Sequence, residues 1–265
     1  MNLFQSLILG IVQGFTEFLP VSSSGHIVLL QKIFGVSDGT RTFAIVLHLG
    51  TLLPVFIVFW RDIWELLKRP FQKYTLLLVI GTVPAVIFAL FAGDVIDSLF
   101  TTGAYLGVGF LITGILLLYA DYISAEGKKQ DKDITVLDSA VVGVFQAIAI
   151  CPAVSRSGAT ISASLFRKLD KKAAAKFSFM LSIPAILGGA VWEVKNLLSE
   201  PESFARIIPL NYIVGFLAAA LSGYLAIGFL LKLIQESKLK YFSIYVFILA
   251  VFIFADQFLF RIYFK

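Results

Sequence analysis

Charged residues are scarce in this sequence. Only 15% of its 265 residues are Asp, Glu, Lys or Arg, whereas 58% are hydrophobic, and the mean hydropathy is +0.90. A soluble domain has about 25% charged and about 45–50% apolar residues, so an ordinary soluble globule is excluded. Uncharged apolar runs of bilayer-spanning length recur along the whole chain, which predicts an integral membrane protein.

Cysteine and histidine are also nearly absent. The single cysteine, Cys151, excludes an internal disulfide and a metal site built from several thiolates, and the two histidines are His26 and His48. The formal net charge is +5, but the basic residues lie mostly in short gaps between apolar runs, where membrane topology accounts for them. We therefore expect no nucleic-acid partner.

Six apolar segments are long enough to cross a bilayer, which takes about 20 helical residues. They are residues 43–60, 74–92, 103–120, 177–192, 210–231 and 241–260. Two further segments, 3–34 and 134–166, are apolar at both ends but are interrupted by the polar stretches 20–26 and 151–159. The apolar part after each interruption is too short to recross the bilayer, so we expect two re-entrant helical hairpins.

The two halves of the chain repeat each other at a nearly constant offset. The matches are Gly10 and Gln13 with Gly143 and Gln146, and Ser22–Gly25 with Ser155–Gly158, at offset 133; Phe43 with Phe177 and Gly81 with Gly215, at offset 134; and Ala120–Asp121 with Ala255–Asp256, at offset 135. Each half has an odd number of crossings, so the second half is inverted relative to the first. We predict an all-α polytopic membrane protein that forms one domain over residues 1–265, with inverted-topology repeat halves of approximately 1–125 and 134–265.

Basic residues predict the orientation in the membrane. Fifteen lie in gaps on one side: Arg61, Lys68, Arg69, Lys73, Lys128, Lys129, Lys132, Arg167, Lys168, Lys171, Lys172, Lys176, Lys232, Lys238 and Lys240. Six lie on the other: Lys32, Arg41, Lys195, Arg206, Arg261 and Lys265. The positive-inside rule places the fifteen in the cytoplasm and both termini outside. The two hairpins then enter from opposite faces, so that their polar tips can meet near the midplane.

The tips contain two charges that are costly at membrane depth. Gln13 and Glu17 are four residues apart, so they share a helix face just before the first tip, and Arg156 in the second tip is the natural counter-charge for Glu17. The alternatives are that Glu17 lies near the headgroups or caps a helix, and that Arg156 only neutralises Glu17. Hydroxyls surround these charges, and a short helix follows each tip, whose N-terminal N–H groups favour an anion.

The two histidines differ in their neighbours. His26 follows the serines of the first tip and could exchange a proton with a serine or a leaving phosphate, or could instead be satisfied by a backbone carbonyl. His48 lies within a predicted crossing; it can simply hydrogen-bond a neighbouring helix, and a minor role in a cavity stays open.

Two segments resemble the motifs of a known family. Residues 10–26, GIVQGFTEFLPVSSSGH, and 152–160, PAVSRSGAT, closely resemble those of the undecaprenyl-diphosphate phosphatases, bacterial membrane enzymes associated with bacitracin resistance. The resemblance covers nearly the whole chain and includes FSFMLSIP at 177–184. One position departs from the family pattern, because Ala153 stands where the second motif commonly has glycine. We expect a local backbone adjustment there and unchanged chemistry.

The resemblance implies hydrolysis of undecaprenyl diphosphate to undecaprenyl phosphate and inorganic phosphate, which recycles the lipid carrier for peptidoglycan and other wall polymers. The catalytic candidates are Glu17, Ser23, His26 and Arg156. The substrate-binding candidates are Ser22, Ser24, Gly25, Ser155, Ser157, Gly158 and Thr160. Gln13 and Glu17 are the candidate ligands of a divalent cation, Mg²⁺ or Ca²⁺, which offsets developing charge.

Several alternatives stay open at the sequence level. Ser23 is either the nucleophile or the hydroxyl that orients a water, and either His26 or Glu17 takes the proton. The rival function is a polyprenyl-phosphate transporter or flippase, because inverted repeats with broken helices are also a transporter design. We expect a bacterial cell membrane location with lipids as partners, and a homodimer is one assembly that the sequence permits.

Overall fold

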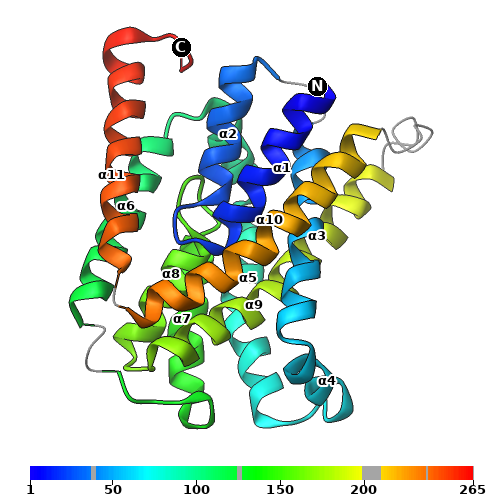
Figure 1. Ribbon diagram of the computed structural model, residues 1–265, viewed down its shortest axis with the longest axis vertical. Coiled ribbons are helices and arrows are strands. Elements are labelled where there is room, and N and C mark those ends of the chain that lie inside the picture. Colours follow the sequence, from blue (N-terminus) through cyan, green and yellow to red (C-terminus); the bar gives the residue numbers. More distant parts are fainter. Residues whose placement is uncertain (37–39, 124–126, 199–209, 237, 265) are drawn as a thin grey trace.

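The structure of the protein is a computed structural model that describes residues 1–36, 40–123, 127–198, 210–236 and 238–264. Two basic residues assigned above to the outer face, Arg206 and Lys265, lie outside these ranges. The helices are α1 (Leu3–Phe18), α2 (Ser23–Phe34), α3 (Thr40–Val58), α4 (Trp60–Lys68), α5 (Lys73–Thr102), α6 (Leu106–Ile123), α7 (Val136–Ile148), α8 (Arg156–Phe166), α9 (Lys171–Leu198), α10 (Leu210–Gln235) and α11 (Leu239–Ala255), with the short helical turns η2 (Asp131–Asp133) and η4 (Asp256–Phe260) (Figure 1). No strand occurs within the described ranges, so the all-α prediction is confirmed.

Most of the predicted crossings correspond to long apolar helices. Among the described residues, five segments are long and apolar enough to span a bilayer: Lys73–Gly93, Leu106–Ile123, Lys171–Trp192, Leu210–Gln235 and Leu239–Phe260. A sixth is obtained if α3 and α4 are counted together, although an 86° bend separates them. The chain is therefore a multi-pass membrane protein by the length and composition of its helices.

Several helix boundaries differ from the prediction, and two of them have local reasons. The segment expected to start at residue 103 begins as a helix only at Leu106, because Gly103 has a φ of +68° and caps the C-terminus of α5. The segment expected to run to residue 60 ends at Val58, where the chain turns sharply into α4.

The two broken segments begin and resume in the same way. Asn2 at the start of α1 and Thr135 at the start of α7 each form a capping box with the residue three positions later. Ser22 and Ser155 then cap α2 and α8, where each side chain accepts a hydrogen bond from the glycine N–H three residues on. The interruptions are thus shorter than the polar stretches 20–26 and 151–159, since the cap serines start the next helix at once.

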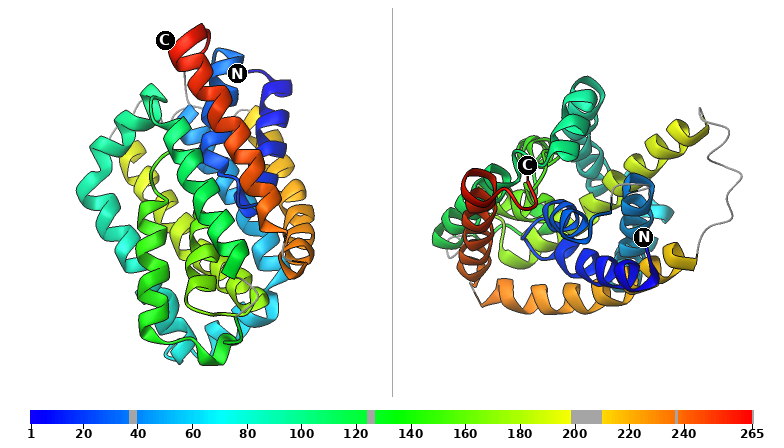
Figure 2. Two further views of the ribbon diagram at one scale, coloured as in Figure 1. Left: turned by 90° about the vertical axis from the view of Figure 1, so that its left-hand side faces the viewer. Right: turned by 90° about the horizontal axis from the view of Figure 1, so that it is seen from above.

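The two broken segments occupy opposite ends of the bundle. The α1–α2 pair lies at the end that carries the N-terminus and the end of α11, whereas the α7–α8 pair lies toward the other end (Figure 1). The view from above shows α2 enclosed among the longer helices (Figure 2). In α8 every residue from Ser157 to Leu165 is buried. The turns after α1 and after α7 therefore meet inside the protein.

Glycines permit the closest helix contacts. A Cβ atom added at Gly10 of α1 would lie 2.4 Å from the carbonyl oxygen of Gly215 in α10, and one added at Gly143 of α7 would lie 2.7 Å from that of Gly81 in α5. Such backbone approach requires small residues on both helices. Helix α1 thus packs against α10, which contains Gly215, and helix α7 packs against α5, which contains Gly81.

Candidate functional site

The turn after α1 lies against the start of α8. The Ser157 hydroxyl donates to the carbonyl oxygen of Leu19 at 3.1 Å, and Gly158 lies next to Pro20. A Cβ atom at Gly158 would come within 3.0–3.4 Å of Ser155 and Pro20, so a larger residue would crowd the two turns. The two polar interruptions therefore contact each other inside the protein.

Glu17 is the centre of this contact. Its side chain is 5% exposed, and its Oε1 accepts a hydrogen bond from Nη2 of Arg156 at 2.5 Å. Its Oε2 accepts hydrogen bonds from Nε2 of Gln13 at 3.0 Å and from the Ser23 hydroxyl at 2.7 Å. The Gln13 contact is the one that spacing on a helix face predicts. These three interactions offset the cost of burying the carboxylate.

Arg156 joins the second half of the chain to this cluster. It is the first residue of α8, its side chain is 15% exposed, and its Nη1 donates to the carbonyl oxygen of Ser178 in α9 at 3.2 Å. The ion pair with Glu17 spans 139 positions of sequence, as the pairing of the two buried charges predicts. The guanidinium is held at two points and so has a defined direction.

His48 belongs to the cluster, although the sequence left open only a minor role for it in a cavity. Its Nε2 lies 3.4 Å from Oε2 of Glu17, and its Nδ1 lies 2.7 Å from the carbonyl oxygen of Ala44. Both ring nitrogens of His48 therefore face oxygen atoms. The available signal was a histidine inside an otherwise apolar crossing, but that pattern does not say which helix the ring meets.

One partner of His26 is a backbone carbonyl, the alternative that the sequence left open, and the other is a hydroxyl of a distant helix. Its Nδ1 lies 2.7 Å from the carbonyl oxygen of Ser22, and its Nε2 lies 2.7 Å from the hydroxyl of Tyr245 in α11. The ring is buried, stacks on Tyr245 and meets Phe110 edge to face. A neutral imidazole satisfies both contacts. His26 therefore braces the start of α2 against α11, and among the described contacts its nitrogens do not bond to Ser23.

The remaining hydroxyls of the site divide into buried groups and partly exposed groups. Ser22 and Ser155 are buried caps, and each also lies 3.2 Å from the serine two residues on, Ser24 or Ser157. The Thr160 hydroxyl donates to the carbonyl oxygen of Arg156 and lies 2.6 Å from the hydroxyl oxygen of Ser178. By contrast Ser23 and Ser24 are partly exposed.

The candidate glycines allow close packing at the tips. A Cβ atom at Gly25 would lie 2.5 Å from the ring of Phe110 and 2.9 Å from Cβ of Ala153. Ala153 itself has a φ of +63°, a left-handed conformation that costs a non-glycine residue about 1–2 kcal/mol. The backbone thus keeps a conformation that favours glycine, and Ala153 carries the strain in place of the expected adjustment.

One buried oxygen of the site lacks a partner. Oε1 of Gln13 makes no hydrogen bond, and Glu17 lies beside it. An amide oxygen and a carboxylate are suitable ligands for Mg²⁺ or Ca²⁺, which complete their shells with water and phosphate oxygens. The described residues contain no group of three His, Cys, Asp or Glu side chains that could hold a metal alone. The donor set therefore fits a divalent cation only together with an anionic ligand.

The arrangement suits chemistry at a phosphoryl group. Arg156 offers hydrogen-bond donors to phosphate oxygens, and the partly exposed Ser23 offers a hydroxyl. That hydroxyl already donates a hydrogen bond to Glu17. A hydroxyl, a carboxylate within hydrogen-bond reach of it and a guanidinium on the same carboxylate are groups that phosphoryl transfer can use.

Comparisons with known proteins find relatives along nearly the whole chain. A family model described as Bacitracin resistance protein BacA matches residues 6–252. The chain is 50% identical over 251 residues to the Undecaprenyl-diphosphatase of Carboxydothermus hydrogenoformans, covering 95% of this chain and 96% of that protein. It is 43% identical over 259 residues to Undecaprenyl-diphosphatase 4 of Bacillus cereus, covering 97% and 98% respectively.

Proposed function

This chain belongs to the bacitracin resistance protein BacA family, and we propose that it hydrolyses undecaprenyl diphosphate to undecaprenyl phosphate and inorganic phosphate. The observation that carries the proposal is the hydrogen bond from the Ser23 hydroxyl to Glu17, on the same carboxylate that pairs with Arg156. Relatives of nearly equal length carry the name of this activity. The reaction recycles a lipid carrier for cell-wall polymers.

Substrate binding begins at Arg156. The terminal phosphate competes with Glu17 for the guanidinium, since both are anions that an arginine binds with two parallel hydrogen bonds. The second contact of Arg156, to the carbonyl oxygen of Ser178, keeps its direction during this exchange. The partly exposed Ser24 and the first-turn N–H groups of α2 and α8 supply further donors.

The chemical step transfers the terminal phosphoryl group to Ser23. The Ser23 oxygen attacks the terminal phosphorus as its proton passes to Glu17, and the bond to the bridging oxygen breaks, which releases undecaprenyl phosphate. Water then attacks the phosphoserine, inorganic phosphate leaves, and the proton on Glu17 returns to the serine oxygen. The 2.7 Å contact supports Glu17 as the proton acceptor, in preference to His26, whose nitrogens bond elsewhere.

A divalent cation fits this site together with the substrate. Gln13 and Glu17 would hold it, and when bound it would offset the negative charge of the diphosphate. Its identity, Mg²⁺ or Ca²⁺, is part of the proposal. Binding of Mn²⁺ observed by electron paramagnetic resonance, lost in Gln13→Leu, would support this ligand set, and binding unchanged in that variant would refute it.

We also propose the arrangement in the membrane. Two features support an inverted repeat with re-entrant hairpins: both broken segments start with matching capping boxes, and Gly10 meets Gly215 as Gly143 meets Gly81. The basic residues then place the termini outside in a bacterial cell membrane. Externally added thiol reagents should label a cysteine at Lys195 and spare one at Lys129; the reverse pattern would invert the orientation.

The function is tested by phosphate release from undecaprenyl diphosphate by purified protein, with Mg²⁺ or Ca²⁺ and with chelator. We expect wild type to be active, Glu17→Gln and Ser23→Ala to lose about 10³-fold in kcat/KM, and acid-quenched wild type to carry phosphate on Ser23. A wild-type protein that binds the lipid and releases no phosphate would indicate the carrier function instead. An active Ser23→Ala variant would assign the attack to water.

A further inference from the structure

The residue before Ser23 has a strained backbone. Ser22 has a φ of +69° and a ψ of 99°, in a part of conformational space that favours glycine. Its side chain is buried and caps α2 by accepting a hydrogen bond from the N–H of Gly25. A strained conformation of this kind persists only where neighbouring groups hold it in place, so the contacts of Ser22 must include such a group.

The matching cap in the second half of the chain is not strained. Ser155 corresponds to Ser22 at the offset of 133, and it caps α8 in the same way, by accepting a hydrogen bond from the N–H of Gly158. Its φ of −71° and ψ of 119° are ordinary extended values. Capping a helix therefore does not require the left-handed conformation. Of the two caps, only the one that precedes Ser23 adopts it.

The same comparison identifies the group that holds Ser22. Its carbonyl oxygen accepts a hydrogen bond from Nδ1 of His26 at 2.7 Å, in addition to the helical one from the His26 backbone N–H at 3.3 Å. The residue that corresponds to His26 in the second half is Ala159, which offers the carbonyl oxygen of Ser155 only its backbone N–H, at 2.8 Å. The strained cap thus has a side-chain donor on its carbonyl oxygen, and the relaxed cap has an alanine in that place.

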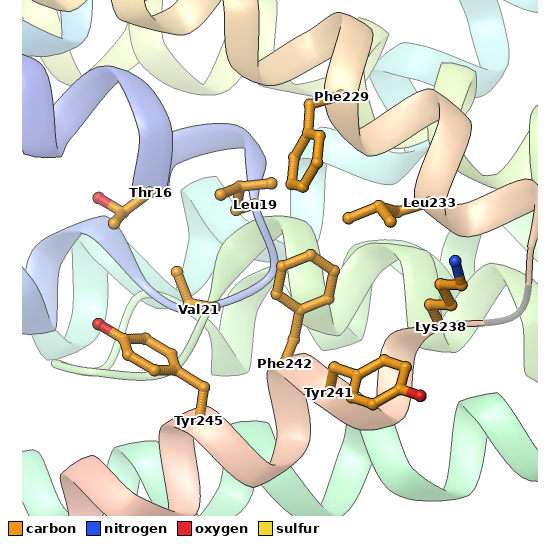
Figure 3. Close-up of a pocket in the computed structure, with 9 residues that line it drawn as sticks. All are labelled: Thr16, Leu19, Val21, Phe229, Leu233, Lys238, Tyr241, Phe242 and Tyr245. Atoms are coloured by element: carbon orange, nitrogen blue, oxygen red, sulfur yellow. The ribbon is translucent and has the colours of Figure 1, made fainter.

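Tyr245 in turn fixes the ring of His26. A carbonyl oxygen can only accept, so the ring proton lies on Nδ1, and Nε2 of the neutral ring accepts a hydrogen bond from the Tyr245 hydroxyl at 2.7 Å. The two rings also stack, with their planes 14° apart. Tyr245 extends from α11 toward the turn after α1, beside an apolar cleft of about 460 Å³ between α10, α11 and this turn (Figure 3). Because α11 packs along α6, the brace connects the turn to the body of the bundle.

We infer that Tyr245 is a positioning residue for the proposed reaction. Through His26 it holds Ser22 in the strained conformation. That conformation aims the Ser23 hydroxyl at Oε2 of Glu17, which lies 2.7 Å away. The inference rests on the proposed function and explains how the nucleophile meets its base. Because a displacement of about 1 Å at a reacting group can lower a rate about 10²-fold, partial release of the turn should lower kcat about tenfold.

The test removes the Tyr245 hydroxyl in two backgrounds. Tyr245→Phe keeps the stacked ring, and we expect it to lower kcat for phosphate release from undecaprenyl diphosphate about tenfold, with KM changed by less than about twofold. Glycine adopts a positive φ without strain, so in protein with Ser22→Gly the turn no longer needs the brace. Adding Tyr245→Phe to that background should lower kcat by less than about twofold. Tyr241→Phe, one turn earlier on α11 and beside the same cleft, is the matched control and should behave as wild type.

Two kinetic results would overturn the positioning role. One is wild-type kcat in Tyr245→Phe, because the hydroxyl would then hold nothing that the reaction needs. The other is a loss that is equally large with Ser22→Gly, because Tyr245 or His26 would then act on the substrate directly and not through the strained turn.

Nuclear magnetic resonance measures the brace without activity. In histidine-labelled wild type the nitrogen spectrum should show His26 protonated at Nδ1, and Tyr245→Phe should shift its Nε2 resonance; loss of these signals in His26→Gln assigns them. Signals of His26 that stay unchanged in Tyr245→Phe would overturn the inference. A wild type that releases no phosphate would remove the proposed function, and the resonances would still decide whether Tyr245 holds the ring.

Discussion

The buried ion pair between Glu17 and Arg156 can be tested by a double-mutant cycle. Arg156→Leu removes the guanidinium and leaves a carboxylate that is 5% exposed. Removing one partner of a buried pair costs about 3–5 kcal/mol, because the other charge stays buried without compensation. Glu17 keeps hydrogen bonds from Gln13 and Ser23 and the contact with His48, so we expect the lower value, about 3 kcal/mol.

The double variant should recover most of this loss. In Glu17→Gln with Arg156→Leu no unpaired charge is buried, and the amide can still bond to Ser23, so the free energy of unfolding should lie within about 1 kcal/mol of wild type. Activity should not recover, because Arg156 binds the phosphate and Glu17 takes the proton. We expect both single variants and the double variant to lose about 10³-fold in kcat/KM.

The assay is unfolding by SDS titration in mixed micelles, followed by tryptophan fluorescence, with phosphate release measured on the same preparations. The reasoning is refuted if Arg156→Leu is as stable as wild type, because the carboxylate then does not depend on its partner. It is equally refuted if the double variant is less stable than either single variant, or if it regains activity.

Two further predictions concern other contacts of the site and of the fold. His48→Leu should lower kcat about tenfold with little change in KM. His48→Gln should restore most of the lost kcat, because the amide again offers Glu17 a hydrogen-bond donor. Full activity in the leucine variant would exclude a positioning role. Gly10→Ala should lower the free energy of unfolding by about 1–3 kcal/mol, because its Cβ would lie 2.4 Å from the oxygen of Gly215. Gly228→Ala should be neutral or stabilising, because open space surrounds that position. Equal stabilities of the two alanine variants in the SDS titration would contradict the close approach.

The sequence alone determined the class of the protein and the members of its central pair. Apolar runs report helix length directly, because the thickness of a bilayer imposes it. The spacing of Gln13 and Glu17 predicted that they share a helix face, since they are four positions apart, and the structure adds the hydrogen bond between them. The cost of an isolated buried charge predicted that Glu17 and Arg156 meet, and the structure confirms the contact.

Only the tertiary structure decided which side chains meet across different helices. His26 follows the serines in sequence, yet its ring bonds to Tyr245, whereas His48 lies against Glu17 from another helix. The cleft between α10 and α11 is equally invisible in the sequence, because its walls are apolar residues like those of every crossing. Periodicity tells which residues share one helix face, but the rotation and crossing of packed helices determine what that face contacts.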